Sequence, residues 1–185
     1  MAEYYLISQL PSLDGIGENT PLPMTEERFR ELCSRFLGKK AARKIEKLTL
    51  LPPLTPEKAG SSLIEAWNAG ERDLRLALAK ARADKLGKPF PSENKSFPIE
   101  LVKAVSAAVE IESPLEAENF LLRYRLSFLE SLRPMDNFSE EFLFYYGLKL
   151  KLLVRIRQFD AKLGESEYRK IYNSILNGDR LEAIE

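Results

Sequence analysis

The stretch that decides the fold is residues 139–164, SEEFLFYYGLKLKLLVRIRQFDAKLG. Apolar side chains recur along it every three or four residues, the spacing that places them on one face of an α-helix. Ser139 is a good N-cap residue, and Gly164 is the residue type that often follows a helix end. The stretch predicts the longest helix of the chain, with an inward stripe of Tyr145, Leu148, Leu152, Ile156, Phe159 and Leu163.

Other helices are indicated on the N-terminal side of this stretch. Residues 113–116 combine an N-cap serine, a proline at the first helical position and a capping-box glutamate, so a helix is expected from there to about residue 132. Thr25 is an N-cap candidate for a helix that ends at Gly38. Further helices are expected at about 39–48, from 55 to a turn at 68–70, at 71–86, 101–109 and 165–177.

The N-terminus differs from the rest of the chain. Residues 4–10, YYLISQL, are aromatic and β-branched, which predicts a short strand or extended segment. The expected fold class is therefore all-α: a helical bundle or funnel-like array of about seven or eight helices with a short N-terminal extended segment. We expect residues 1–185 to form one helical domain, with 87–98 as the candidate hinge between two sub-layers.

Composition narrows the possible functions. The 185 residues carry 28 Lys and Arg against 28 Asp and Glu, so the net charge is zero. Nucleic-acid-binding proteins usually have a basic excess, because phosphate contacts supply much of their affinity, so nucleic acid is not the expected partner. No basic region precedes an apolar one at the N-terminus, and no apolar stretch reaches ~20 residues, which favours a cytoplasmic protein.

The absence of histidine is the most informative negative feature. It excludes Ser–His and Cys–His nucleophile pairs and histidine-containing zinc sites. Cys33 is the only cysteine, so neither an intramolecular disulfide nor a thiolate metal cluster can form. We therefore expect no catalytic site, no cofactor and no metal, although carboxylate, lysine or tyrosine chemistry stays open.

Two groups of cations are candidates for contacts with a partner. Each is also compatible with a plain solvated helix face, which is the commoner role of such runs. The first group is Lys39, Lys40, Arg43, Lys44 and Lys47, and the second is Lys149, Lys151, Arg155, Arg157 and Lys162.

Four other features have both a functional and a structural interpretation. Trp67 is either an interface anchor or, more commonly at this spacing, a core residue. Cys33 is either a reactive thiol or a small buried hydrophobe, and without a histidine base the second is favoured. The residues 15–17, Gly-Ile-Gly, lack the spacing of a dinucleotide-binding loop and predict a turn. A di-metal carboxylate site fails for lack of histidine ligands among Glu116, Glu118, Glu140 and Glu141.

A weak internal similarity links two of the expected helices. Residues 71–78 and 118–125 both place an acidic residue three positions before a leucine and arginines after it. Helical sequences produce such matches easily, so this pattern alone predicts no repeat architecture.

Several segments resemble a known family. Residues 67–80, WNAGERDLRLALAK, are similar to a segment of the C (or d) subunit of V/A-type rotary ATPases, with Asp73 replacing the family's asparagine. The run 145–150, followed by Arg155, Arg157, Gly164 and Tyr168, is similar to the end of that subunit. The start, Tyr-Tyr at 4–5 and Leu-Pro at 10–11, resembles a bacterial family of unknown function encoded in V-type ATPase operons.

The resemblance implies a non-catalytic role. The family subunit is a helical funnel that seats the rotor stalk on the membrane ring, so stalk or ring subunits would be the partners, and membrane association would be peripheral. This chain is long enough for about one and a half of that subunit's three helical repeats. The alternative is a stand-alone helical adaptor or regulatory protein that binds a protein or nucleic acid through a basic helix.

Overall fold

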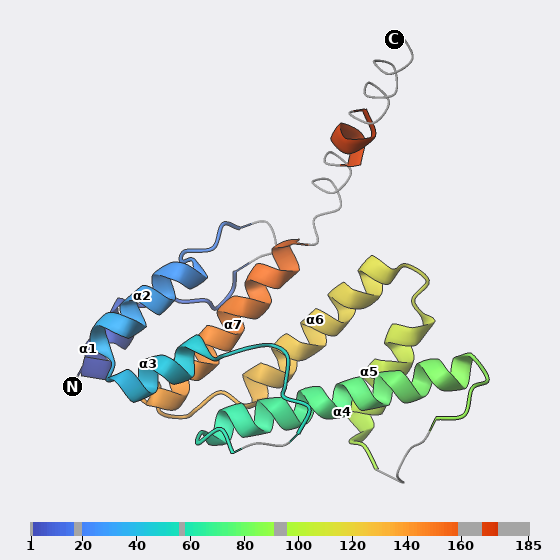
Figure 1. Cartoon of the computed structure of the whole chain (residues 1–185), viewed down its shortest axis with the longest axis horizontal. Coiled ribbons are helices and arrows are strands. Elements are labelled where there is room, and N and C mark those ends of the chain that lie inside the picture. The colour runs from blue at the N-terminus through green and yellow to red at the C-terminus, as the bar shows by residue number, and fades with distance from the viewer. Residues whose placement is uncertain (1, 17–19, 56–57, 91–95, 159–167, 174–185) are drawn as a thin grey trace, which may run out of the picture.

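The computed structural model describes residues 2–16, 20–55, 58–90, 96–158 and 168–173. Within these ranges the chain is helical and contains no strand, which confirms the all-α prediction. A short helical segment at 168–173 follows seven labelled helices (Figure 1). These are α1 (Ala2–Gln9), α2 (Glu26–Phe36), α3 (Lys39–Glu46), α4 (Ser62–Lys85), α5 (Ile99–Glu110), α6 (Pro114–Ser131) and α7 (Glu140–Gln158).

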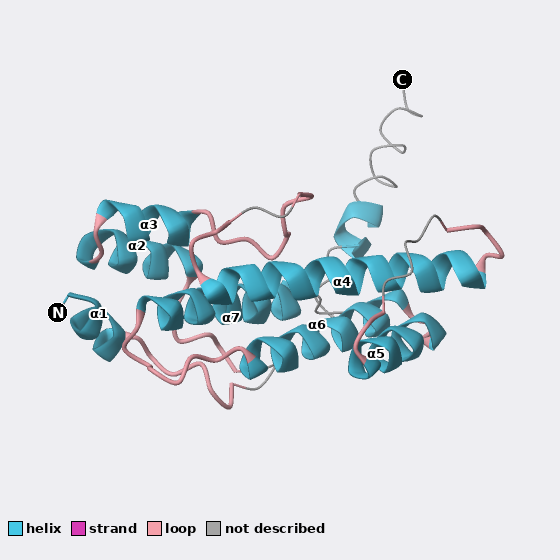
Figure 2. Ribbon diagram, turned by 90° about the horizontal axis from the view of Figure 1, so that it is seen from below, coloured by secondary structure: helices cyan, strands magenta, loops and turns pink. Residues whose placement is uncertain are grey.

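Helix α7 is the central element of the array. It contacts α2, α3, α4 and α6, and both views show it between the α1–α3 end of the molecule and the end that holds α5 (Figures 1 and 2). The eight residues 143–150 are all buried, so the helix is covered well beyond the predicted stripe. A helix enclosed on several sides needs apolar residues around most of its circumference, which explains this dense run. Phe159, Leu163 and the Gly164 stop lie outside the described residues.

The buried apolar side chains form two clusters. The larger surrounds α7 and takes in α1, α2, α3, the first turns of α4 and the second half of α6. The smaller joins the second half of α4 to α5 and to the start of α6, around Leu74, Val105 and Leu121. The 87–98 segment connects α4 to α5, which pack on each other within the smaller cluster. Its role as a hinge stays a prediction.

The predicted N-terminal extended segment was wrong, because residues 2–9 form helix α1. Leu6 and Ile7 are buried on the larger cluster, whereas Tyr4 and Tyr5 are exposed. In this all-helical array a strand would find no partner for its backbone hydrogen bonds, and a helix satisfies most of them internally. The turn predicted at 68–70 was also wrong, since α4 continues through it from Ser62 to Lys85.

The predicted helix starts at Thr25 and Ser113 are confirmed. Thr25 Oγ1 accepts a hydrogen bond from the Arg28 backbone N–H at 3.2 Å. Ser113 Oγ accepts one from the Glu116 N–H at 3.4 Å, with Pro114 at the first helical position. Both hydroxyls satisfy N–H groups that the first turn of a helix leaves unpaired.

Gly70 leaves room on α4 for the Phe128 ring of α6, and replacing it with alanine is expected to destabilise the protein. A Cβ at this position would lie 2.4 Å from two ring atoms of Phe128, whose ring stacks on Trp67 at 6.1 Å. Gly→Ala inside a helix normally stabilises by about 0.5–1 kcal/mol. Here overpacking of about 1–3 kcal/mol opposes that gain, so urea denaturation should give a lower free energy of unfolding.

The control uses the same substitution beside a smaller neighbour. In a Phe128→Leu background most of the Gly70→Ala penalty should disappear, because the clash partner has been shortened. A Gly70→Ala protein more stable than the parent would contradict the close approach.

Candidate functional site

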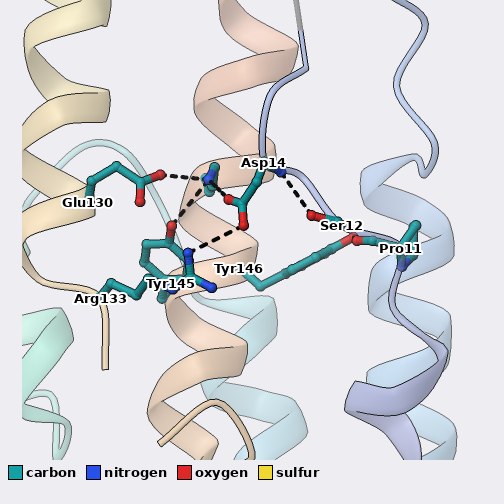
Figure 3. A network of polar contacts seen from close by, with 8 residues as sticks. Pro11, Ser12, Asp14, Glu130, Arg133, Tyr145 and Tyr146 are labelled. Atoms are coloured by element: carbon teal, nitrogen blue, oxygen red, sulfur yellow. Dashed lines mark hydrogen bonds and ion pairs between the residues drawn. The ribbon is translucent and has the colours of Figure 1, made fainter. Parts of the chain in front are cut away.

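A buried lysine organises a polar network that joins three parts of the chain. Lys149 lies in the middle of α7 and is 7% exposed. Its Nζ donates to Asp14 Oδ1 at 2.5 Å and to Tyr145 Oη at 3.2 Å, and it lies 2.6 Å from Glu130 Oε1 of α6. Arg133 adds a 3.3 Å hydrogen bond to Asp14 Oδ2 (Figure 3). The network therefore joins α6 and α7 to the loop that follows α1.

The electrostatics of the network keep the lysine charged. Burial alone would lower the pKa of Lys149, but hydrogen bonds to Asp14, Glu130 and Tyr145 outweigh it and raise the pKa above its ordinary value. The hydrogen bond from Lys149 lowers the pKa of Asp14, and burial raises the pKa of Tyr145 to about 12. A catalytic lysine needs a lowered pKa so that its neutral amine is available at neutral pH. The arrangement therefore suits a structural clamp rather than a proton-transfer site.

The clamp holds the loop next to the N-terminal motif. Tyr146 of α7 donates its hydroxyl to the Pro11 carbonyl at 3.0 Å, and the Asp14 N–H donates to Ser12 Oγ at 3.1 Å (Figure 3). Leu13 between them is buried. The loop after α1 is thus fixed by side chains of the central helix, which in turn fixes where α1 ends.

Acidification is expected to weaken this clamp through Asp14. Its pKa is lowered from the ordinary 3.8, so its contribution to stability is present above about pH 4 and is lost as the pH falls through the lowered value. Urea denaturation at several pH values should show a smaller loss of stability in Asp14→Asn than in the parent between pH 5 and pH 2. If the free energy of unfolding depends on pH in the same way in both proteins, ionised Asp14 does not stabilise the clamp.

Two aromatic side chains of α1 are exposed at the surface. Tyr4 is 60% exposed and stacks on Phe138 with ring centroids 4.4 Å apart. Tyr5 is 56% exposed and contacts Phe36 at 5.4 Å. We call Tyr4, Tyr5, Phe36 and Phe138 the aromatic patch. Large aromatic side chains on a rigid base lose little conformational entropy when they bind, which is why they are common at protein interfaces.

The two groups of cations have different positions. Lys39, Lys40 and Arg43 of α3 are exposed, as is Lys47 directly after it. The Lys44 ammonium instead donates to the Gly60 carbonyl at 3.1 Å and to Glu140 at 3.3 Å.

Most of the second group makes contacts within the protein. Lys149 belongs to the clamp, Lys151 pairs with Glu26 at 2.5 Å, and Arg155 lies 3.5 Å from Glu118. Arg157 donates to the Thr20 carbonyl. Lys162 lies outside the described residues. The cations of this part of α7 therefore contact neighbouring segments of the chain. They do not form the plain solvated face that the sequence favoured.

The other candidate residues take structural roles. Trp67 and Cys33 are buried, as predicted, and burial raises the pKa of the Cys33 thiol to about 12, so it is inert as a nucleophile near neutral pH. Gly15 has the positive φ of a turn residue, and Gly17 lies outside the described residues.

The four glutamates are dispersed rather than gathered. Glu116 lies in the first turn of α6, Glu118 faces arginines, Glu140 pairs with Lys44, and Glu141 accepts the Leu63 N–H at 3.0 Å. Among the described ranges no group of three or more potential ligands could hold a metal ion.

A buried ion pair between α4 and α6 was missed at the sequence level. Glu71 is 1% exposed, and its Oε1 accepts a hydrogen bond from Arg125 Nε at 2.8 Å. Arg125 also approaches Glu118, which in turn pairs with Arg155 of α7. The only signal was the weak similarity of 71–78 to 118–125, whose acids and arginines meet here. Nothing in either segment showed that they pack against each other.

Comparison with protein-family models, curated proteins and solved structures found no significant match. Over the described part of the chain, no helix combines the length and the apolar character needed to cross a membrane.

Proposed function

We propose that this chain is a non-catalytic helical subunit that acts through protein contacts, as an accessory or coupling component of a V/A-type rotary ATPase. The observation that carries the proposal is the placement of the Tyr-Tyr…Leu-Pro motif. Tyr4 and Tyr5 point outward on α1, while Leu6 is buried and the Pro11 carbonyl is held by Tyr146. The motif that supports the family resemblance thus places two aromatic rings at the surface on a fixed base.

A non-catalytic role agrees with the chemistry of the polar groups. The buried lysine is held charged, and the buried cysteine has a raised pKa. Both residues are therefore suited to a structural role in the packing of the helices. Torque-transmitting or coupling subunits need a rigid body and complementary surfaces, with a total of about 1,200–2,000 Å² buried in a stable contact. The aromatic patch is the proposed centre of such a contact.

The test is affinity purification of the tagged chain from its own host in mild detergent, with identification of the proteins that co-purify. We expect near-stoichiometric stalk or ring subunits with the parent, and their loss in Tyr4→Ser/Tyr5→Ser. The matched control is Val102→Ser/Ile99→Ser, which removes exposed apolar side chains from α5 at the opposite end. Equal recovery of the ATPase subunits with the parent and both variants would show that the aromatic patch is not the contact. Recovery of an unrelated complex would overturn the proposed ATPase role.

A second candidate is a stand-alone adaptor that binds its partner through α3. The observation in its favour is the exposure of Lys39, Lys40 and Arg43 on this short helix and of Lys47 directly after it. If the partner were nucleic acid, affinity would fall steeply with salt, because cations bound to the phosphates are released on binding. Titration of labelled single-stranded and duplex oligonucleotides at two salt concentrations tests this, and absence of binding at low salt excludes that version.

A further inference from the structure

A cavity of about 500 Å³ lies beneath the segment that connects α3 to α4. The walls are mainly apolar and come from the connecting segment, from α4 and from Leu148 of α7. Small-molecule sites in proteins have volumes of about 300–1,000 Å³ and mainly apolar walls with a few polar groups, so both its size and its lining suit a ligand.

The charged side chains among the described residues that line this cavity are cationic. Lys44, Lys47 and Lys58 line it, and none of the described residues in its lining is a carboxylate. Lys44 is partly neutralised by Glu140, which lies 3.3 Å from its Nζ. Lys47 and Lys58 are exposed, and within the described part of the chain neither has an ion-pair partner. The potential at the mouth is therefore positive, which favours an anionic ligand.

The polar groups of the wall are hydrogen-bond donors or can act as donors. Trp67 lines the cavity with a fully buried side chain, and its Nε1–H has no acceptor in the described residues. Asn68 beside it is 9% exposed and also lines the cavity. The Asn68 amide and the lysine ammonium groups can donate to a bound acceptor, whereas the Trp67 Nε1–H is buried away from solvent.

We propose that this cavity binds a small organic anion, an apolar body that carries a phosphate or carboxylate group. The apolar body is enclosed by Leu48, Leu51, Ile64 and Leu148, and the anionic group lies toward Lys47 and Lys58. This site is separate from the aromatic patch and does not depend on the identity of a protein partner. The apolar walls favour the apolar body of the ligand, and the lysines favour its anionic group. The experiment measures these two contributions to affinity separately.

Trp67 is the only tryptophan of the chain and therefore reports directly on the cavity. The full-length protein is titrated with phenyl phosphate, benzoate, inorganic phosphate and benzyl alcohol at constant low ionic strength. Tryptophan emission and calorimetry are the readouts. We expect saturable binding of phenyl phosphate or benzoate, with about tenfold or more weaker binding of inorganic phosphate and benzyl alcohol. If phenyl phosphate binds more tightly than benzoate, the charged group is a phosphate; if benzoate binds more tightly, it is a carboxylate.

The variants test whether the cavity lysines supply the charge. Lys47→Gln/Lys58→Gln should lower the affinity for the aromatic anion by about two- to fivefold for each lysine, which is the range of an exposed ion pair. The matched control, Lys39→Gln/Lys40→Gln, removes two exposed lysines that lie outside the cavity wall and should leave affinity unchanged. Ala59→Phe, which fills the cavity from the connecting segment, should abolish binding without lowering the melting temperature.

Three results would overturn the proposal. The first is absence of saturable binding for both aromatic anions. The second is an equal loss of affinity in the two double-lysine variants, which would indicate non-specific attraction to surface charge. The third is unchanged affinity in a folded Ala59→Phe protein.

Discussion

Replacing Arg125 with methionine is expected to lower the free energy of unfolding by about 3–5 kcal/mol, the usual cost of leaving one partner of a buried ion pair uncompensated. Glu71 is 1% exposed and accepts its hydrogen bond from Arg125. Arg75 also approaches Glu71, with its Nε 3.6 Å from Glu71 Oε2 and its side chain 45% exposed. That partner is too distant for a good hydrogen bond and too hydrated to replace Arg125.

Chemical denaturation monitored by circular dichroism measures the change. The control is Arg72→Met, because Arg72 lies on the same helix as Glu71 and is not its ion-pair partner. The double variant Glu71→Leu/Arg125→Met should recover most of the lost stability, because apolar replacements of a buried pair are often neutral. An Arg125→Met protein within about 1 kcal/mol of the parent would show that Glu71 is hydrated or protonated instead, since typical surface changes cost no more than this.

Replacing Trp67 with alanine is the second large effect, with an expected loss of about 3–5 kcal/mol. Its side chain is fully buried, stacks on Phe128 and belongs to the larger apolar cluster where α4 meets α6 and α7. Truncation removes that burial and extends the neighbouring cavity, so the surrounding side chains cannot collapse to fill the space. Thermal and urea denaturation followed by circular dichroism give the value.

Trp67→Phe is the matched control, because it keeps an aromatic ring at the junction and should cost much less than the alanine. It also removes the unpaired Nε1–H, which offsets part of the lost burial. A similar loss in both variants would indicate that the indole shape itself, rather than buried area, holds α4 against α6.

Some of the candidate site was predictable from the sequence. Zero histidines and one cysteine argued against the common catalytic and metal sites, and apolar spacing correctly assigned Trp67 and Cys33 to the core. The Lys149 clamp was not predictable, because its partners Asp14 and Glu130 are separated from it by many residues. The sequence predicts that Lys149 belongs to an exposed basic face, because periodicity shows which face of a helix is polar and not what covers that face.

What the sequence determined by itself is the helical class and the local signals for its helices: the apolar spacing of 139–164 and the capping residues Thr25 and Ser113. These depend on neighbours within one or two turns, which a single segment contains. The tertiary structure decided that residues 4–9 are helical, that α4 passes through Gly70 without a turn, and that Glu71 meets Arg125. These features depend on burial against segments distant in the chain, because packing energy exceeds the small differences in local propensity.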